Sequence, residues 1–204
     1  NRPFFLFVSH STIHFPWQTK DSPSHRKPGK RYESSKGKLG PHVGAPIQPI
    51  VQGMIEELDT SVGEIVAALK QHQLEKRTLI FFTSDNGGII RMKDVPNNKQ
   101  NRISNNTPWS GQKPDLYEGG HRGPAIAWWP GHIQPGQSDA TTITTDLFPT
   151  FLKLTGASPG KSDGVDLSSL WLKQEPLPQR TLFWRIGKSK AVRWKNWKLV
   201  RNHE

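Results

Sequence analysis

Hydrophobic residues in this chain fall into short blocks that long polar stretches separate. Residues 3–9 and 78–83 are continuous apolar runs, the pattern of strands that are covered on both faces. Between them, apolar residues recur at spacings of three and four from Ile47 to Leu69, which predicts an amphipathic helix over residues 46–71. Strand, helix and strand in this order predict a βαβ unit with parallel strands and a right-handed crossover.

The second half of the chain predicts shorter elements. Residues 124–130 have the composition of a strand, and residues 145–155 form a short apolar helix that Gly156 would end. Three further short strands are expected near the end of the chain, at residues 182–186, 191–194 and 198–200. The pattern therefore predicts an α/β domain over residues 1–160 and the start of a small antiparallel α+β subdomain over residues 161–204.

Charge narrows the choice of partner. The net charge is +11, with 28 Lys and Arg against 17 Asp and Glu, and this favours an anionic partner: nucleic acid, an anionic membrane or an anionic substrate. Residues 20–38 and residues 185–201 hold much of the basic charge, although a solvated surface is the simpler interpretation of both. The chain has no cysteine, which excludes disulfides and thiol nucleophiles, and no apolar run long enough for a membrane span.

Chemistry-bearing residues follow the first two predicted strands. His14 comes shortly after the first strand, and Asp85 and Asn86 come directly after the second. Sites in open α/β sheets form beyond the C-terminal ends of the strands, so we expect these three residues to lie close together. Asp and Asn supply hard oxygen ligands, which suit calcium or magnesium better than zinc. The plainer alternative is that the Asp-Asn-Gly-Gly segment is an ordinary turn and His14 a loop histidine.

A set of motifs in a fixed order carries a resemblance to a known family. The chain resembles sulfatases of the arylsulfatase type in five segments: Leu-Asp-Thr-Ser-Val-Gly at 58–63, Phe-Thr-Ser-Asp-Asn-Gly at 82–87, Gly-Gln-Lys to Gly-Pro at 111–124 with the strand and Trp-Pro-Gly that follow, Asp-Leu-Phe-Pro-Thr at 146–150, and Val-Arg to Lys-Leu at 192–199. Each motif is weak by itself, and the ordered set is specific. The resemblance covers nearly the whole chain.

The resemblance implies an alkaline-phosphatase-like mixed sheet flanked by helices and a calcium-dependent sulfuric ester hydrolase. By position, Asp85 and Asn86 match two ligands of the family's Ca²⁺. His14 matches the histidine that binds sulfate and acts on the leaving group, and Lys113 matches the sulfate-binding lysine; both count as catalytic and substrate-binding residues. The implied substrate is a sulfated small molecule or a sulfated glycan. Sulfatases of this type are usually exported, which implies a periplasmic, extracellular or lysosomal location.

The chain also departs from the family pattern. It has no Cys or Ser in the C/S-x-P-x-R motif that becomes the formylglycine nucleophile, and no match to two further calcium-binding aspartates. We expect these parts upstream of Asn1, and we expect the 204 residues alone to be inactive. Gly123 stands where the family usually has Val.

Two other functions compete with hydrolysis of sulfate esters. A non-catalytic polyanion-binding module, or a degenerate sulfatase relative, would use the basic residues 20–38 together with the Trp- and Lys-rich residues 184–201. A related phosphatase or phosphodiesterase would hold two zinc ions, and Asp-Asn-Gly after the strand argues against it, because a zinc enzyme would show Asp-His there. Nucleic acid is the less favoured partner, because it does not explain the order of the motifs.

Overall fold

A computed structural model describes residues 2–21, 46–92 and 102–202 of the chain. The chain forms two compact units, one of residues 1–68 with 89–105 and one of residues 69–88 with 106–204. Most of the basic stretch at residues 20–38 lies outside the described residues. The domain boundary predicted between residues 160 and 161 divides the chain differently from these two units. It stays a prediction.

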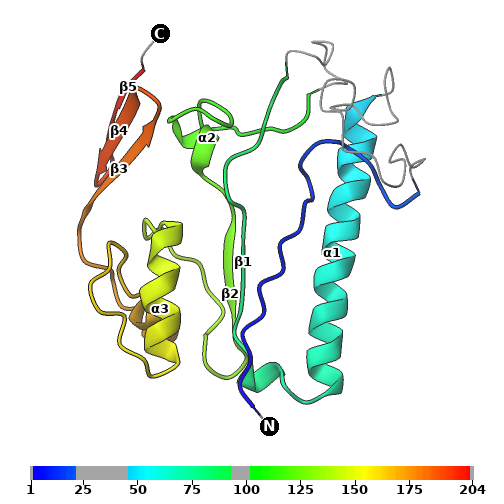
Figure 1. Ribbon diagram of the computed structural model, residues 1–204, viewed down its shortest axis with the longest axis vertical. Coiled ribbons are helices and arrows are strands. Elements are labelled where there is room, and N and C mark those ends of the chain that lie inside the picture. Colours follow the sequence, from blue (N-terminus) through cyan, green and yellow to red (C-terminus); the bar gives the residue numbers. More distant parts are fainter. Residues whose placement is uncertain (1, 22–45, 93–101, 203–204) are drawn as a thin grey trace, which may run out of the picture. The chain divides into compact units, whose positions relative to one another are not determined.

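The first unit is built on the long helix α1 (Ile47–Gln71), which confirms the predicted helix to within one residue at its start (Figure 1). Its first two turns bury Ile47, Val51 and Met54 against Trp17 and Ile103. This cluster is the core of the unit, and Trp17 and Ile47 are each only 1% exposed. The i, i+4, i+7 spacing of the three helical residues places them on one face, which is why the helix packs this way.

The strand predicted at residues 3–9 is wrong. Residues 2–10 have no regular secondary structure, and Phe5 and Phe7 are 78% and 79% exposed. An apolar run indicates burial, but a strand forms only where a neighbouring strand satisfies its backbone groups. No described strand pairs with this segment, so the described residues do not form the predicted parallel βαβ unit.

The second unit contains the predicted second strand, β1 (Ile80–Thr83), which follows the short 3-10 helix η2 (Glu75–Arg77). Its partner is β2 (Ala125–Trp128), and the two strands run antiparallel with Ile80 opposite Trp128 and Thr83 opposite Ala125. The partner of β1 is thus a strand more than 40 residues later in the chain, whereas the sequence pattern had favoured the one before α1. The indole N–H of Trp129 donates to the carbonyl of Lys76 at 3.0 Å and ties the end of β2 to η2.

Two helices pack beside β1. The helix α3 (Leu147–Leu154) follows the 3-10 helix η4 (Thr144–Asp146) and ends before Gly156, whose φ of 79° is the left-handed conformation expected at that position. The helix α4 (Ser168–Lys173) was not predicted. Phe81 of β1 stacks on Trp171 at 5.4 Å between ring centroids and meets Phe151 edge-on at 6.3 Å. These three rings join β1, α3 and α4.

A buried ion pair holds the turns around α3. Asp146 is 0% exposed, and its two carboxylate oxygens accept hydrogen bonds from both guanidinium nitrogens of Arg180. The same carboxylate accepts the backbone N–H groups of Ile143 at 2.9 Å and Val165 at 3.0 Å. One side chain therefore fixes three segments that are distant in sequence, and each of its oxygens has two partners.

The three strands predicted at the end of the chain are confirmed. β3 (Thr181–Ile186), β4 (Ser189–Trp194) and β5 (Trp197–Arg201) form an antiparallel meander in the order β3-β4-β5. Lys195, in the turn between β4 and β5, has a φ of 53°. No helix within the described ranges is long and apolar enough to cross a membrane.

We predict that Asp146→Ala lowers the free energy of unfolding by about 3–5 kcal/mol, because it leaves the partly buried Arg180 guanidinium without its carboxylate and the N–H groups of Ile143 and Val165 without their acceptor. Urea unfolding followed by circular dichroism measures this change. The matched control is Glu175→Ala, which removes the exposed partner of Lys173 and should change stability by less than about 0.5 kcal/mol. Equal effects of the two substitutions would contradict the role assigned to Asp146.

Candidate active site

The turn that follows β1 presents two oxygen-bearing side chains. Ser84 Oγ donates to the Asn86 carbonyl at 2.9 Å, and Asn86 Nδ2 donates to the Gly87 carbonyl at 3.1 Å. These bonds close the turn and leave Asn86 Oδ1 without a donor among the described residues. Asp85 is exposed, and its carboxylate likewise has no hydrogen bond or ion pair within the described ranges. Both side chains can therefore offer oxygen atoms to a ligand.

A backbone-to-backbone contact joins this turn to the short helix α2 (Glu118–His121). The N–H of Gly87 donates to the Gly120 carbonyl at 3.0 Å. A Cβ on Gly87 would lie 2.0 Å from the Gly119 carbonyl oxygen, and one on Gly120 would lie 2.0 Å from the Asp115 carbonyl oxygen. A Cβ on Gly119 would lie 2.3 Å from the Gly111 carbonyl oxygen. No side chain fits at Gly87, Gly119 or Gly120, so the close approach of the chain segments requires glycine at these three positions.

Lys113 is tied to the same turn. Its backbone N–H donates to the Gly88 carbonyl at 3.3 Å, two residues after Asn86. Lys113 is half-buried, and no carboxylate in the described part of the chain pairs with its ammonium group. The structure therefore brings together the segments that bear Asp85, Asn86 and Lys113, which are well separated in sequence.

The side chain of Asn106 links the segments that bear Asp85, Asn86 and Lys113. The sequence pattern did not predict this role. Asn106 Nδ2 lies 2.8 Å from the Gly88 carbonyl, 3.1 Å from that of Gly111 and 2.9 Å from that of Gly119. These carbonyls belong to the turn after β1, to the loop before Lys113 and to α2. The sequence placed Asn106 in a polar loop, and nothing in the local pattern distinguishes it from the other asparagines there.

His14 belongs to the first unit, and its predicted proximity to Asp85 stays a prediction. Its side chain is exposed, with Nδ1 2.8 Å from the Phe15 carbonyl and its ring 4.2 Å from the Phe15 ring. A carbonyl oxygen only accepts, so Nδ1 carries a proton and Nε2 is the atom that can gain or lose one.

The free side-chain oxygens of Asp85 and Asn86 are of the type that binds a hard cation. They would supply only part of its coordination. Asp85 and Asn86 offer carboxylate and amide oxygens, whereas calcium takes about six to eight oxygen ligands. Residues 2–21, 46–92 and 102–202 contain no group of three or more His, Cys, Asp or Glu residues placed to hold a metal. The two side chains therefore fit calcium as part of a larger ligand set.

A charged cluster that the sequence pattern did not predict joins α2 to the sheet of β3–β5. Figure 1 shows the ribbon of α2 beside this sheet. Glu118 Oε2 accepts from Arg193 Nη1 at 2.7 Å, and Glu118 Oε1 accepts from Lys198 Nζ at 2.9 Å. His121 stacks on Trp184 at 4.8 Å, and its Nε2 is in direct contact with Lys198 Nζ. Two of the motifs quoted for the resemblance, at residues 111–124 and 192–199, thus meet through opposite charges.

The protonation of this cluster follows from burial and charge. Burial raises the pKa of Glu118, but the hydrogen bond and charge of Lys198 and the charge of Arg193 outweigh it and lower the pKa below its usual value of 4.5. Burial, together with the positive charge of Lys198, lowers the pKa of His121. His121 is therefore neutral at pH 7, and its Nε2 accepts a hydrogen bond from the Lys198 ammonium group.

Comparisons with known proteins show which family the chain belongs to. A sequence model of the Sulfatase family matches residues 1–157. The chain belongs to the sulfatase family. It is 37% identical over 152 residues to N-acetylgalactosamine-6-sulfatase of Mus musculus. That alignment covers 69% of this chain and 28% of the mouse protein. It is 35% identical over 196 residues to arylsulfatase A of Bos taurus, covering 94% of this chain and 33% of that protein. The chain thus spans about a third or less of these sulfatases.

Solved sulfatase structures share the fold. The crystal structure of Ps i-CgsB in complex with k-i-k-neocarrahexaose matches with a TM-score of 0.66 and 30% identity, over 79% of this chain and 36% of that one. The PsFucS1 sulfatase from Pseudoalteromonas sp. matches with a TM-score of 0.58 and 25% identity, over 86% of this chain and 38% of that one. The chain therefore has the α/β, alkaline-phosphatase-like fold that its motifs implied, with mixed helices and antiparallel strands.

We predict that Glu118→Gln lowers the free energy of unfolding by about 1–3 kcal/mol near neutral pH, because two charge-assisted hydrogen bonds are lost. The folded-state pKa of Glu118 lies below its unfolded value, so its contribution is fully present above the unfolded value and is lost as the pH falls through the folded one. The stability difference between the parent chain and the variant should therefore stay constant while the pH is above about 4.5 and should narrow as the pH falls further below that value. Urea unfolding of both proteins at a series of pH values measures this stability difference.

Glu64→Gln is the matched control, because Glu64 is an exposed glutamate of α1 and the substitution removes the same charge. Its effect should stay within about 0.5 kcal/mol at every pH. A stability gap for Glu118→Gln that stays constant over the whole pH range would show that the carboxylate charge is not what joins α2 to the sheet.

Proposed function

We propose that the whole protein containing this chain hydrolyses sulfate esters. The observation that carries the proposal is the cluster of Asp85, Asn86 and Lys113, which the glycine contacts and Asn106 hold on neighbouring segments. The sulfatase family supports this class of reaction. The proposal includes the calcium ion and the formylglycine nucleophile that the resemblance implies, with the nucleophile and further calcium ligands supplied from outside this chain.

Lys113 is proposed to bind the sulfate group of the substrate. A sulfate ester carries one negative charge, and further charge builds on the leaving oxygen as the ester bond breaks. The Lys113 ammonium is half-buried and has no carboxylate partner in the described ranges, so its charge is available to a substrate. A fixed cation at this position would stabilise the transition state more than the ground state.

His14 is proposed to bind the sulfate group and to protonate the leaving oxygen. The hydrogen bond from Nδ1 to the Phe15 carbonyl orients the ring and leaves Nε2 as the working atom. In the protonated ring, Nε2–H would donate to the leaving oxygen as negative charge develops there. This role needs His14 close to Lys113 in the assembled protein, and the activity measurement below tests that requirement.

Asp85 and Asn86 are proposed to supply two of the ligands of a calcium ion. Their free oxygen atoms support this assignment, because carboxylate and amide oxygens are the ligands calcium prefers. When bound, calcium would lower the energy of negative charge on the reacting oxygens. Because the described residues contain no group of three or more His, Cys, Asp or Glu that could hold a metal, the proposal takes the remaining ligands from elsewhere in the whole protein.

The proposed substrate is a sulfated small molecule or a sulfated glycan, and export from the cytoplasm is part of the proposal. Relatives named N-acetylgalactosamine-6-sulfatase and a related structure that holds a neocarrahexaose support a glycan. The net charge of +11 supports an anionic substrate in general. The 204 residues alone are expected to turn over no substrate, because they lack the nucleophile motif.

We predict that Lys113→Ala and His14→Ala each lower kcat/KM of the whole protein on an aryl sulfate by about 10²–10³-fold, because each removes a group that acts on developing charge. Initial rates of p-nitrophenol release measure this loss. The matched control is Lys161→Ala, an exposed lysine elsewhere in the second unit, which should leave kcat/KM unchanged. Full activity in either variant would overturn the assignment of that residue.

We predict that Asp85→Ala abolishes the stabilisation of the whole protein by calcium. A ligand at about 100 times its dissociation constant stabilises the folded state by about 2.7 kcal/mol, which thermal unfolding detects without any activity assay. Asp139→Ala removes an exposed carboxylate elsewhere and should leave the calcium-dependent shift intact. A calcium shift of equal size in both variants would exclude Asp85 as a ligand.

A further inference from the structure

The short helix α2 contacts both segments of the candidate active site through its backbone. The Gly119 N–H donates at 2.8 Å to a carbonyl of the lysine loop (residues 110–115). The Gly120 carbonyl accepts the Gly87 N–H at 3.0 Å, in the Asp-Asn turn (residues 84–88). A shift of α2 would therefore displace both segments.

The packing between α2 and the lysine loop leaves no free space. A Cβ on Gly120 would lie 2.0 Å from the Asp115 carbonyl oxygen and 2.9 Å from the Gln112 carbonyl oxygen. These two carbonyls lie before and after Lys113 in the chain. Because Gly120 contacts the loop on both sides of Lys113, the position of α2 sets where the Lys113 backbone lies.

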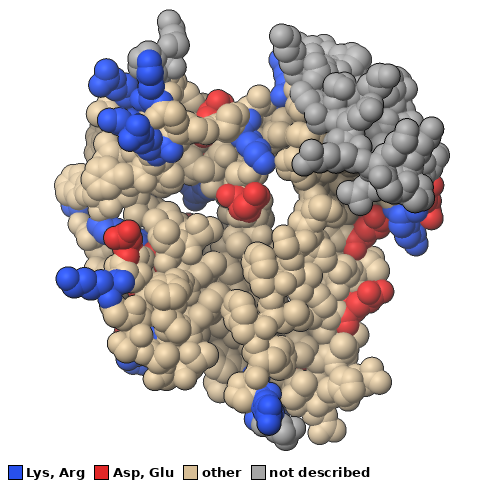
Figure 2. Space-filling model, viewed as in Figure 1, with Lys and Arg blue, Asp and Glu red and all other residues tan. Residues whose placement is uncertain are grey.

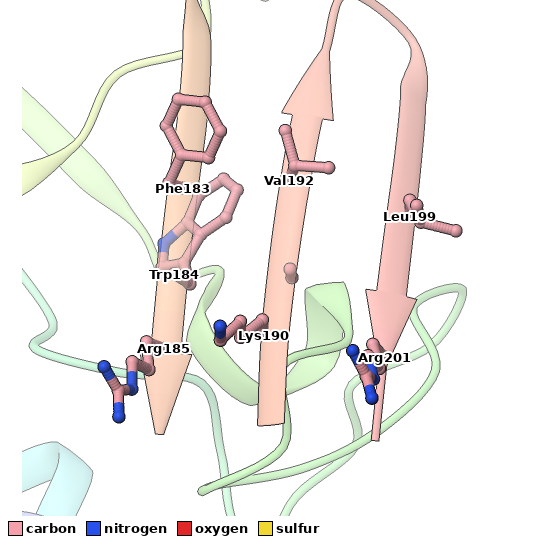
Figure 3. A pocket seen from close by; sticks show the side chains of 8 residues that line it. Phe183, Trp184, Arg185, Lys190, Val192, Leu199 and Arg201 are labelled. Carbon is pink, nitrogen blue, oxygen red and sulfur yellow. The ribbon is translucent and has the colours of Figure 1, made fainter. Parts of the chain in front are cut away.

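The side chains of α2 and of the residue before it point instead to the β3–β5 sheet. The Tyr117 hydroxyl accepts from Asn202 Nδ2 at 3.1 Å, directly after β5. The His121 ring stacks on Trp184 of β3 at 4.8 Å, and Glu118 reaches both β4 and β5. Figure 3 shows part of the ribbon of α2 behind the three strands. Backbone contacts thus join α2 to the candidate site, and side chains join it to the sheet.

Glu118 is the ionic part of the attachment to the sheet. Arg193 of β4 and Lys198 of β5 are directly opposite each other in the strand register, and like charges in such a pair repel. The Glu118 carboxylate accepts a hydrogen bond from each of them, at 2.7 and 2.9 Å. Residues 176–203 contain no Asp or Glu, so the sheet has no carboxylate of its own to take this place. Figure 2 shows Lys and Arg side chains gathered where Figure 1 draws the sheet.

The place of α2 depends on these contacts because the helix is short. It has four residues, and a helix of this length is not stable by itself. Charge-assisted hydrogen bonds are roughly twice as strong as those between neutral groups. The Glu118 side chain is only 19% exposed, so salt and solvent weaken its two ion pairs little. Glu118 therefore supplies the strongest contacts that hold α2 on the sheet.

We propose that Glu118 is a positioning residue of the candidate active site. Its carboxylate holds α2 on β4 and β5, and α2 in turn fixes the lysine loop and the Asp-Asn turn relative to each other. Glu118 acts through these segments rather than on the substrate. The part of the proposal that concerns activity rests on the proposed function.

The test compares two variants of the whole protein. Glu118→Gln keeps the size of the side chain and removes its charge. The matched control is Thr150→Val, which removes a buried hydroxyl of α3 that donates to the Asp146 carbonyl at 2.5 Å and accepts the Leu167 N–H at 2.8 Å. Each substitution removes two hydrogen bonds of the second unit, so the two should lower stability by similar amounts.

Hydrogen exchange followed by mass spectrometry measures how often each segment opens, without any activity assay. For Glu118→Gln we expect peptides that contain Gly87, Lys113 and Gly119 to exchange about tenfold faster than in the parent protein. The reason is that these N–H groups are donated between the segments that α2 joins. Peptides from α3 and α4 should exchange at the parent rate. Thr150→Val should give the opposite pattern.

Initial rates on an aryl sulfate, at a temperature at which both variants are folded, measure the effect on the site. Glu118→Gln should lower kcat/KM by about tenfold or more, because small displacements of catalytic groups are costly. Thr150→Val should change kcat/KM by less than about threefold. In a double-mutant cycle, adding Arg193→Gln to Glu118→Gln should lower kcat/KM by no more than about twofold further, because the two residues act together.

Parent-like exchange around Lys113 in Glu118→Gln would contradict the proposal, and so would equal exchange patterns in Glu118→Gln and Thr150→Val. Fully additive losses in the cycle, or full kcat/KM of Glu118→Gln in an active protein, would contradict it as well. Arg193→Gln, which removes one of the two ion pairs, replaces Glu118→Gln in both measurements if that variant does not fold. If Glu118→Gln loosens the two segments while the parent protein hydrolyses no sulfate ester, the proposed function fails and the positioning role stands.

Discussion

The contact between the backbone of Gly87 and that of Gly119 and Gly120 is the constraint on which the second unit depends. The Gly87 N–H reaches the Gly120 carbonyl at 3.0 Å, and a Cβ on Gly87 would lie 2.0 Å from the Gly119 carbonyl oxygen. Because the two backbones touch, the turn that bears Asp85 and the loop that bears Lys113 become one structure. Asn106 then fills the space between them with its amide.

The same contact links the candidate active site to the end of the chain. α2 contacts the turn after β1 through its glycines and the β3–β5 sheet through Glu118. The carboxylate accepts from Arg193 and Lys198, and the neutral His121 lies between Lys198 and Trp184. Glu118 thus anchors α2, which follows the Lys113 loop in the chain, to the β3–β5 sheet. The antiparallel sheet therefore supports the segment that bears the candidate site.

The sequence pattern predicted an element correctly where that element depends only on its own residues. The 3.6-residue period of α1, the three short strands at the end and the glycine after α3 are all local features, and the structure has each of them. Local pattern failed for residues 3–9, because apolar character does not specify whether a strand partner exists. It also missed α4 and the pairing of β1 with β2, which a long loop separates in sequence.

The sequence by itself determined the family, the residue types at the candidate site and most of the regular elements. It could do so because motifs, periodicity and glycine placement are properties of neighbouring residues. Only the tertiary structure decided that Asn106 joins three carbonyls and that Glu118 meets Arg193 and Lys198. Asn106 reaches carbonyls 5 to 18 residues away, and Glu118 meets partners 75 and 80 residues away, so these facts depend on how the chain folds back on itself.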